Sequence, residues 1–183
     1  MTMVVHMVKI PQGRVGALIG PQGKTKEELE QRSGCHIAVN SETGEVEIED
    51  EKAFEPVLAL KVRDAVRAIG RGFSPENAIR LFQDDTYLDI IDLTEYVGKK
   101  TKDLERVRAR IIGTNGKTRR SIEEATGTEV SILGKTVSLV GEIAEVQLAR
   151  EAVEMILSGA PHGTVYKFLE RKRKELRLHD MGL

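Results

Sequence analysis

Ile111-Ile112-Gly113-Thr114-Asn115-Gly116-Lys117-Thr118-Arg119-Arg120 is the stretch that decides the fold. Two apolar residues are followed by two glycines three positions apart, and then by Lys-Thr and two arginines. This pattern predicts a helix, a tight glycine turn and a second helix. Glycine permits positive φ and lets another molecule approach the backbone. The first N–H groups of the second helix are unpaired and partly positive, so the turn suits a phosphate group.

The same pattern occurs 93 residues upstream, at Leu18-Ile19-Gly20-Pro21-Gln22-Gly23-Lys24-Thr25. The offset also relates residues beyond the turn: Leu29 to Ile122, Gly34 to Gly127, Ile37 to Val130 and Val39 to Ile132. A constant offset over such a length is an internal repeat, which indicates two related modules. We expect a first module with a short extra helix at residues 1–84, and a second module with a basic C-terminal helix at residues 85–183.

Each half carries the same succession of elements, β-α-α-β-β-α. In the first half we expect strands at 3–10, 36–39 and 45–49 and helices at 15–19, 24–33 and 54–69, with an extra helix from Ser74-Pro75 to Phe82. In the second half we expect strands at 87–93, 129–133 and 136–140 and helices at 104–111, 117–126 and 146–156. A basic loop at 99–102, a linker at 160–163 and a last helix at 164–178 complete the chain.

The composition predicts a globular protein without a membrane span and without an internal disulfide. Apolar residues make up 40% and charged residues 31%, and no apolar run reaches the roughly 18 residues that a membrane span needs. We also find no secretory signal. The single Cys35 cannot form an internal disulfide, so we expect a buried thiol and a cytoplasmic protein.

Charge divides unevenly between the two halves. Residues 1–92 hold 11 Lys+Arg and 16 Asp+Glu, a net charge of −5, whereas residues 93–183 hold 17 and 13, a net charge of +4. The second half is therefore the one whose charge favours nucleic acid. Trp is absent and aromatic residues are only 4%, which argues against recognition by aromatic stacking.

The glycine turns do not predict an enzyme. A nucleotide-binding P-loop needs a glycine five positions before the glycine of Gly-Lys-Thr, and those positions are Leu18 and Ile111. The histidines show no metal-ligand spacing, and the acidic run from Asp84 to Asp92 has no partner constellation. We therefore expect no catalytic residue, no metal and no cofactor.

The sequence resembles the KH RNA-binding module twice. The matching residues are Ile19-Gly20-Pro21-Gln22-Gly23-Lys24 and Ile112-Gly113-Thr114-Asn115-Gly116-Lys117. The resemblance implies an α+β fold of two tandem type I KH modules, each with a three-stranded antiparallel sheet against three helices. It also implies that the loop clamps the backbone of about four nucleotides of single-stranded RNA, whose bases lie in an adjacent aliphatic groove.

Further residues resemble one family of KH-domain ribosome-assembly factors, known as the dimethylase-interacting protein or partner of Nob. They are residues 110–120, Gly134-Lys135-Thr136-Val137 and residues 160–166. The resemblance implies RNA binding without catalysis at the 3′ end of immature small-subunit rRNA. It also implies partnership with the nuclease that trims that end and with the small ribosomal subunit. Both Gly20 and Gly23 are present, which resembles the archaeal form of the family.

The residues that we expect to contact RNA lie at the two turns. In the second module they are Gly113, Thr114, Asn115, Gly116, Lys117, Arg119, Arg120 and Arg110. In the first module they are Gly20, Pro21, Gln22, Gly23 and Lys24. Since Glu27, Glu28 and Glu30 follow the first turn, we expect the second module to dominate RNA affinity and the first to serve mainly as a protein surface.

Several alternatives stay open at the level of sequence. Ile112, Ile122, Val130 and Ile132 are either the floor of the base groove or ordinary core. The basic C-terminal helix is either an extra phosphate contact or a solvated face. The protein is an assembly factor, a general KH or exosome-type RNA adaptor, or a protein-binding scaffold with vestigial turns. We expect a monomer, although nothing in the sequence decides the oligomeric state.

Overall fold

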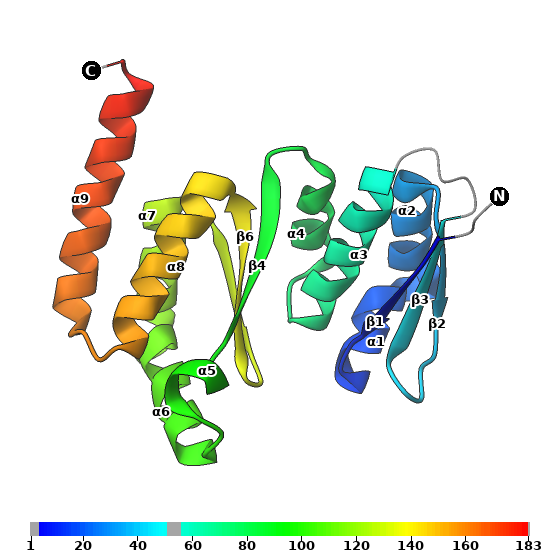
Figure 1. The fold of residues 1–183 in the computed structure, drawn as a ribbon, viewed down its shortest axis with the longest axis horizontal. Helices are drawn as coiled ribbons and strands as arrows, with labels where there is room; N and C mark the ends of the chain where they lie inside the picture. Colours follow the sequence, from blue (N-terminus) through cyan, green and yellow to red (C-terminus); the bar gives the residue numbers. More distant parts are fainter. Residues whose placement is uncertain (1–3, 51–55, 183) are drawn as a thin grey trace. The chain divides into compact units, whose positions relative to one another are not determined.

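The computed structural model describes residues 4–50 and 56–182 (Figure 1). The chain divides into two compact units, Met1–Thr86 and Tyr87–Leu183, two residues from the expected boundary. Each unit contains one three-stranded antiparallel sheet. Met3 and Phe54, which we expected at the starts of a strand and a helix, lie outside the described residues.

The first unit has the order β-α-α-β-β-α that the sequence predicts. Its elements are β1 Val4–Lys9, α1 Gln12–Ile19, the 3-10 turn η1 Pro21–Gly23, α2 Lys24–Ser33, β2 His36–Val39, β3 Glu45–Asp50 and α3 Pro56–Gly70. The short α4 Pro75–Ile79 and η2 Arg80–Phe82 follow, and Ser74 caps α4 by accepting a hydrogen bond from Asn77 N at 3.3 Å. The strand order is β1-β3-β2, and both strand pairs are antiparallel.

The second unit repeats this plan. Its elements are β4 Thr86–Asp92, α5 Thr94–Val97, α6 Thr101–Ile112, the 3-10 turn η3 Thr114–Gly116, α7 Lys117–Thr126, β5 Glu129–Leu133, β6 Thr136–Glu142, α8 Ile143–Leu157 and α9 His162–Asp180. The strand order is β4-β6-β5, and Leu133 pairs with Thr136 across the expected hairpin at Gly134-Lys135. Two tandem KH folds are thus confirmed.

Three local features differ from the expectations. The expected basic loop at 99–102 is shorter, since Thr101 and Lys102 already belong to α6. The short helix α5 was not predicted; it begins because Asp92 Oδ1 accepts hydrogen bonds from Thr94 N at 2.8 Å and Thr94 Oγ1 at 2.7 Å. The expected linker at 160–163 is shorter, since His162 and Gly163 already form the first turn of α9. Pro161, which precedes that turn, is compatible with a helix start as well as with a linker.

Each sheet buries one face against the helices through residues of alternating exposure. In β3, Val46 and Ile48 are completely buried, whereas Glu45 is exposed. The helices contribute their apolar stripes, such as Leu18 of α1 and Leu29 of α2 in the first module and Ile111 of α6 and Ile122 of α7 in the second. Gly34 and Gly127, both left-handed, end α2 and α7 at equivalent places.

Cys35 is buried directly before β2, as the expected buried thiol. None of the helices in the described part of the chain has the length and apolar character that crossing a bilayer demands.

Candidate nucleic-acid interface

The two glycine turns have nearly identical backbones. In the second turn Gly113 lies at φ 75° and ψ 172°, and Gly116 at φ 74° and ψ 15°. In the first turn Gly20 lies at φ 73° and ψ 175°, and Gly23 at φ 78° and ψ 6°. The third position of each turn, Asn115 or Gln22, is left-handed although it is not glycine. Among the described residues, no other non-glycine residue has positive φ.

The two glycines of each turn are needed for different reasons. A Cβ on Gly113 would lie 2.7 Å from Thr118 N, and a Cβ on Gly20 would lie 2.9 Å from Thr25 N, so each first glycine lets the following helix start close against the turn. A Cβ on Gly23 would meet nothing within 4 Å, so this glycine is required by its positive φ alone.

The main chain at both turns is open to solvent. Thr114 and Asn115 are exposed in the second turn, and Pro21 and Gln22 are exposed in the first. The glycines themselves, Gly20 and Gly23 in the first turn and Gly113 and Gly116 in the second, are partly exposed, so their main chain is accessible. This geometry leaves room for a second chain to lie against the backbone.

The second turn offers more backbone donors than the first. Gly113 N donates to Ala109 O at 2.9 Å and Gly116 N to Gly113 O at 3.1 Å, while Lys117 N donates to Thr114 O. Within the described residues, the N–H groups of Thr114 and Asn115 are left without an internal acceptor. The corresponding residues of the first turn are Pro21, which has no N–H, and Gln22. The second turn therefore presents two donors and the first turn only one.

Three exposed cations surround the second turn, and the first turn of α7 contains no acidic residue. Lys117 Nζ lies 5.7 Å from the centre of the Tyr166 ring. Arg120 reaches back to the turn, since its Nη1 is 3.6 Å from the position that a Cβ on Gly116 would take. Arg119 lies on another side of the helix, where its Nε is 3.5 Å from Glu123 Oε2. The positive charge is thus spread around the start of α7.

Glu123 connects Arg119 to the edge strand β5, because its Oε1 accepts a hydrogen bond from Val130 N at 3.0 Å. The first module repeats this arrangement: Lys26 Nζ is 3.2 Å from Glu30 Oε1, which accepts a hydrogen bond from Ile37 N at 2.8 Å. Arg119 and Lys26 therefore mark the same side of each module, between the second helix and the edge strand.

The four groove-floor candidates separate into two kinds. Ile122 and Val130 belong to the buried core of the second module. Ile112 and Ile132 are half-buried. Only Ile112 and Ile132 therefore offer apolar surface on which a base could rest.

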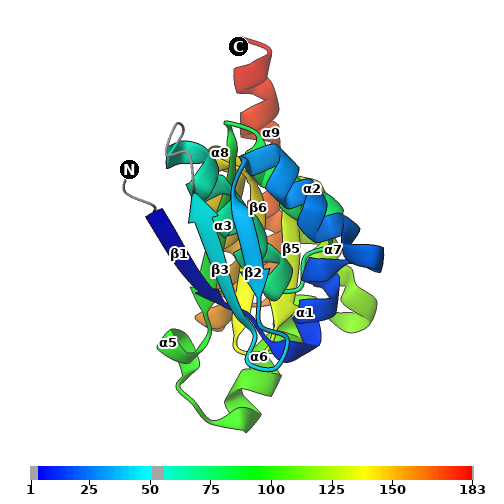
Figure 2. The ribbon, with the colours of Figure 1, turned by 90° about the vertical axis from the view of Figure 1, so that its right-hand side faces the viewer.

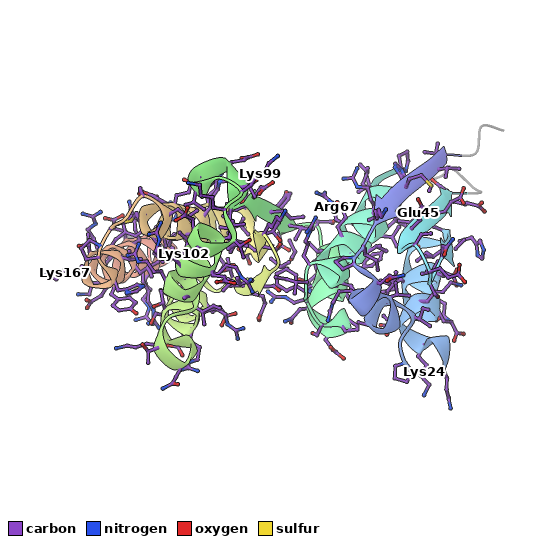
Figure 3. All side chains as sticks on the ribbon, turned by 90° about the horizontal axis from the view of Figure 1, so that it is seen from below. Lys24, Glu45, Arg67, Lys99, Lys102 and Lys167 are labelled. Atoms are coloured by element: carbon purple, nitrogen blue, oxygen red, sulfur yellow. The ribbon has the colours of Figure 1, made fainter. Side chains whose placement is uncertain are left out.

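In the first module, Lys24 begins α2 directly after the turn, and its side chain is exposed (Figure 3). However, Glu27 occupies the first turn of α2, where the matching position in α7 is Arg120. A carboxylate at this place opposes a phosphate group, so the first turn is electrostatically the poorer anion site.

Arg110, which we expected to contact RNA, makes two hydrogen bonds inside the second module. Its Nη1 donates to Ile156 O at 2.7 Å and its Nη2 to Ala160 O at 2.5 Å, at the end of α8. The guanidinium is therefore turned into the module. The position of Arg110 shortly before Gly113 in the sequence says nothing about the direction of its side chain.

Sequence reasoning missed three residues that support the second turn. The hydroxyls of Thr118 and Tyr166 share a hydrogen bond of 2.9 Å, and Thr118 is almost completely buried. His162 Nε2 donates to Arg110 O at 2.8 Å, and the His162 ring stacks on Tyr166 with 6.2 Å between ring centres. The spacing of His162 and Tyr166, one helical turn apart, was the available signal. Together these residues fasten α9 to both helices that flank the turn.

Of the six Lys and Arg residues in α9, three form ion pairs with glutamates of the same helix. Lys172 Nζ is 2.8 Å and Arg171 Nε 3.9 Å from Glu175, and Lys174 Nζ is 3.5 Å from Glu170. This pattern favours the solvated face over an array of phosphate contacts. Among the residues that the structure describes, no group of three or more His, Cys, Asp or Glu could hold a metal ion.

Comparison with known proteins places this geometry in a family. Residues 87–174 match the family described as eukaryotic type KH-domain (KH-domain type I), and residues 4–55 match the KH domain. The chain is 43% identical to KH domain-containing protein MJ0443 of Methanocaldococcus jannaschii, over 94% of this chain and 76% of that protein. It is 30% identical to pre-rRNA-processing protein pno1 of Schizosaccharomyces pombe, over 88% of this chain and 68% of that protein.

A solved structure agrees with these sequence matches. It is aDim2p in the crystal structure of the a/eIF2alpha–aDim2p–rRNA complex from Pyrococcus horikoshii OT3, with a TM-score of 0.87 and 46% identity. The match covers 94% of this chain and 96% of that chain. The two glycine turns, the two KH folds and these relatives lead to one conclusion: the chain belongs to the Dim2p and PNO1 family of KH-domain proteins.

Proposed function

We propose that this protein binds the 3′ region of immature small-subunit rRNA as a ribosome-assembly factor, and that the second glycine turn makes the main contact. The observation that carries the proposal is the pair of unpaired N–H groups at Thr114 and Asn115, with Lys117 and Arg120 beside them. Backbone donors and cations at a helix start are what a sugar–phosphate chain requires.

The relatives supply the choice of RNA. The Pyrococcus aDim2p structure is a complex that contains rRNA, and the eukaryotic relatives are named pre-rRNA-processing proteins. We propose that this chain acts without catalysis in the cytoplasm, in partnership with the nuclease that trims the rRNA 3′ end and with the small subunit. The first module contributes less RNA affinity because Pro21 removes one donor and Glu27 opposes phosphate.

Paired substitutions in the two turns test the assignment. Thr114→Asp with Asn115→Asp places two negative charges at the proposed phosphate position, and should weaken binding of a single-stranded RNA from the 3′ end of the rRNA precursor at least about tenfold. Pro21→Asp with Gln22→Asp is the matched control and should weaken it less. Fluorescence anisotropy measures both. An equal or larger loss in the first turn would reverse the ranking of the modules.

Salt dependence separates an RNA-binding protein from a protein scaffold with vestigial turns. If about three phosphates are neutralised, log K should fall with log salt with a slope of about −2. A flat response would support the scaffold. A scrambled RNA of equal composition tests the choice of rRNA region, because equal affinity for both RNAs would indicate a general RNA adaptor. In the same samples the RNA should stay intact, since we propose no catalysis.

A further inference from the structure

The first module has a second concave surface, which we call the edge groove. It is a cavity of about 360 Å³ lined on one side by residues 7–11, at the end of β1, and on the other by Arg63, Arg67 and Gly70 of α3 and by Arg71, which follows α3. No residue of the glycine turn lines it. β1 is an edge strand of its sheet, and Figure 2 shows it as the outermost strand. The groove therefore runs between a free strand edge and a helix.

The strand edge presents unpaired backbone groups to this groove. Ile10 N donates to Gly44 O of the β3 side at 2.9 Å, so Ile10 and, by alternation, Val8 turn their backbone groups toward β3. Met7 and Lys9 must turn their N–H and C=O groups outward. Within the described residues these groups have no partner. An exposed edge of this kind is a template for pairing with another strand.

The groove is strongly cationic. Its lining contains Lys9, Arg63, Arg67 and Arg71 but no carboxylate. Arg67 extends from α3 with a side chain that is 44% exposed (Figure 3). Asp64, outside the lining, is shared by Arg63 at 3.1 Å and Arg67 at 3.3 Å, so it offsets only part of this charge. A ligand of the groove should therefore be negatively charged.

The spacing of the arginines suits an extended chain. Arg63 and Arg67 are four residues apart in α3, which is about 6 Å along the helix. Alternate side chains on one face of a strand are about 6.6 Å apart. A strand paired with β1 would thus bring an acidic side chain to each arginine if it carried carboxylates at every second position.

In the second module, carboxylates of the same module contact the arginine at the corresponding helix position. The helices α3 and α8 both have 15 residues. Arg63 is the eighth residue of α3, and Arg150 is the eighth residue of α8. Asp89 of β4 accepts hydrogen bonds from Arg150 Nη1 at 2.7 and 2.9 Å. Glu154, in the place of Arg67, accepts from Arg150 Nε at 2.9 Å and from Tyr96 Oη at 2.8 Å.

In the described part of the first module, Arg63 and Arg67 share one carboxylate, Asp64 of their own helix. The hydrogen bond from Ile10 N to Gly44 O in the first module corresponds to the hydrogen bond from Leu93 N to Lys135 O in the second. Four residues before these two donors, His6 of β1 takes the position that Asp89 takes in β4. At the positions of the carboxylates Asp89 and Glu154, the first module therefore has His6 and Arg67. The comparison indicates that carboxylates fit this place in the fold and that the first module has no Asp or Glu at these two positions.

We propose that the edge groove binds an extended acidic segment of a partner protein by strand addition to β1. The main chain of this segment pairs with Met7 and Lys9, and its alternate Asp or Glu side chains contact Arg63 and Arg67. RNA fits less well, because it lacks the regularly spaced N–H and C=O groups that pair with the outward backbone groups of Met7 and Lys9. The site is separate from the glycine turn that we assign to RNA.

A peptide titration tests the proposal on the full chain. The probe is a capped, fluorescein-labelled peptide in which Glu and Val alternate, long enough to span residues 7–11. It should bind, and a peptide in which Lys and Val alternate should not. Arg63→Ala with Arg67→Ala should weaken binding at least about tenfold. Arg32→Ala, a cation on α2 of the same module, is the matched control and should change nothing. Circular dichroism verifies that each variant is folded, and Arg67→Gln alone serves if the double variant is not.

Hydrogen exchange and competition distinguish strand addition from simple charge attraction. The Met7 and Lys9 amides should become protected when the peptide binds. The variant with Thr114→Asp and Asn115→Asp should lose RNA but keep the peptide, so the two proposals can fail separately. The proposal is overturned by absent binding, by equal affinity of the arginine variant, or by unprotected Met7 and Lys9 amides. It is also overturned if single-stranded RNA displaces the peptide and itself requires Arg63 and Arg67.

Discussion

Arg14 and Arg110 make the same pair of hydrogen bonds in the two modules. Arg14 donates to Ile69 O at 2.7 Å and Phe73 O at 2.8 Å, and Arg110 donates to Ile156 O at 2.7 Å and Ala160 O at 2.5 Å. The repeat offset does not relate them, because Arg14 precedes its glycine turn by six residues and Arg110 by three. Each arginine joins the helix before the turn to the carbonyl end of the third helix, where a cation is favourable.

Removing either arginine should destabilise its own module. We expect Arg110→Ala to lower the free energy of unfolding of the second module by about 2 kcal/mol, since hydrogen bonds to a charged donor are lost. Arg14→Ala should do the same in the first module. Hydrogen exchange measures the two effects separately, because the β5 and β6 amides report on the second module and the β2 and β3 amides report on the first. If Arg110→Ala weakened RNA binding strongly and left the β5 and β6 amides as protected as before, Arg110 would be an RNA contact after all.

Gly113→Ala should lower the free energy of unfolding much more than Gly134→Ala does. Both glycines have positive φ, but only at Gly113 would the new Cβ press on the backbone of the next helix, at Thr118. We expect about 1 kcal/mol for the left-handed backbone at Gly134 and about 3 kcal/mol at Gly113, where overpacking adds to it. Urea denaturation measures both. Equal losses would show that the turn can move away from α7 at little cost.

Tyr166 should stabilise the second turn through Thr118. We expect Tyr166→Phe to cost about 1 kcal/mol, because the buried Thr118 hydroxyl loses its partner while the ring beneath Lys117 remains. A double-mutant cycle with Thr118→Val isolates the pair. A coupling energy near zero would mean that the two hydroxyls do not stabilise each other. Tyr87→Phe, at an exposed strand position, is the control.

Cys35 should be chemically silent in the folded protein. Burial raises the pKa of the Cys35 thiol above its usual value, which keeps the unreactive neutral form. A thiol reagent such as Ellman's reagent should therefore react slowly near neutral pH and completely in urea. Because the folded-state pKa is the higher one, this contribution to stability is present below the usual thiol pKa and is lost as pH rises through the raised value. Fast labelling of the native protein would contradict the assignment.

The repeat made much of the fold predictable. Both glycine turns, the helices that flank them and the left-handed ends at Gly34 and Gly127 depend on contacts between near neighbours in sequence, so local patterns suffice. Helix starts were harder to place: Asp92 begins α5 through an Asx turn, and α9 begins inside the apparent linker. Pro and Gly are found in linkers and at helix ends alike, so composition did not separate the two.

Of the candidate site, the sequence identified the exposed turn residues and the cations at the start of α7. It did not give the direction of Arg110 or the support of the turn by Tyr166 and His162. These depend on which elements meet across about fifty residues of chain. The alternatives for Ile112, Ile122, Val130 and Ile132 were likewise separated only by burial in the folded module.

By itself the sequence determined that the chain holds two KH modules with one glycine turn each, because helix periodicity and the freedom of glycine are local properties. Only the tertiary structure decided which cations remain available to a ligand. Arg110 and Arg150 are bound by carbonyl and carboxylate groups brought from distant elements, while Arg120 stays at its turn. Arg63 and Arg67 line the edge groove and share Asp64, a neighbour in their own helix. The physical reason is that the partners of a charged side chain are set by packing.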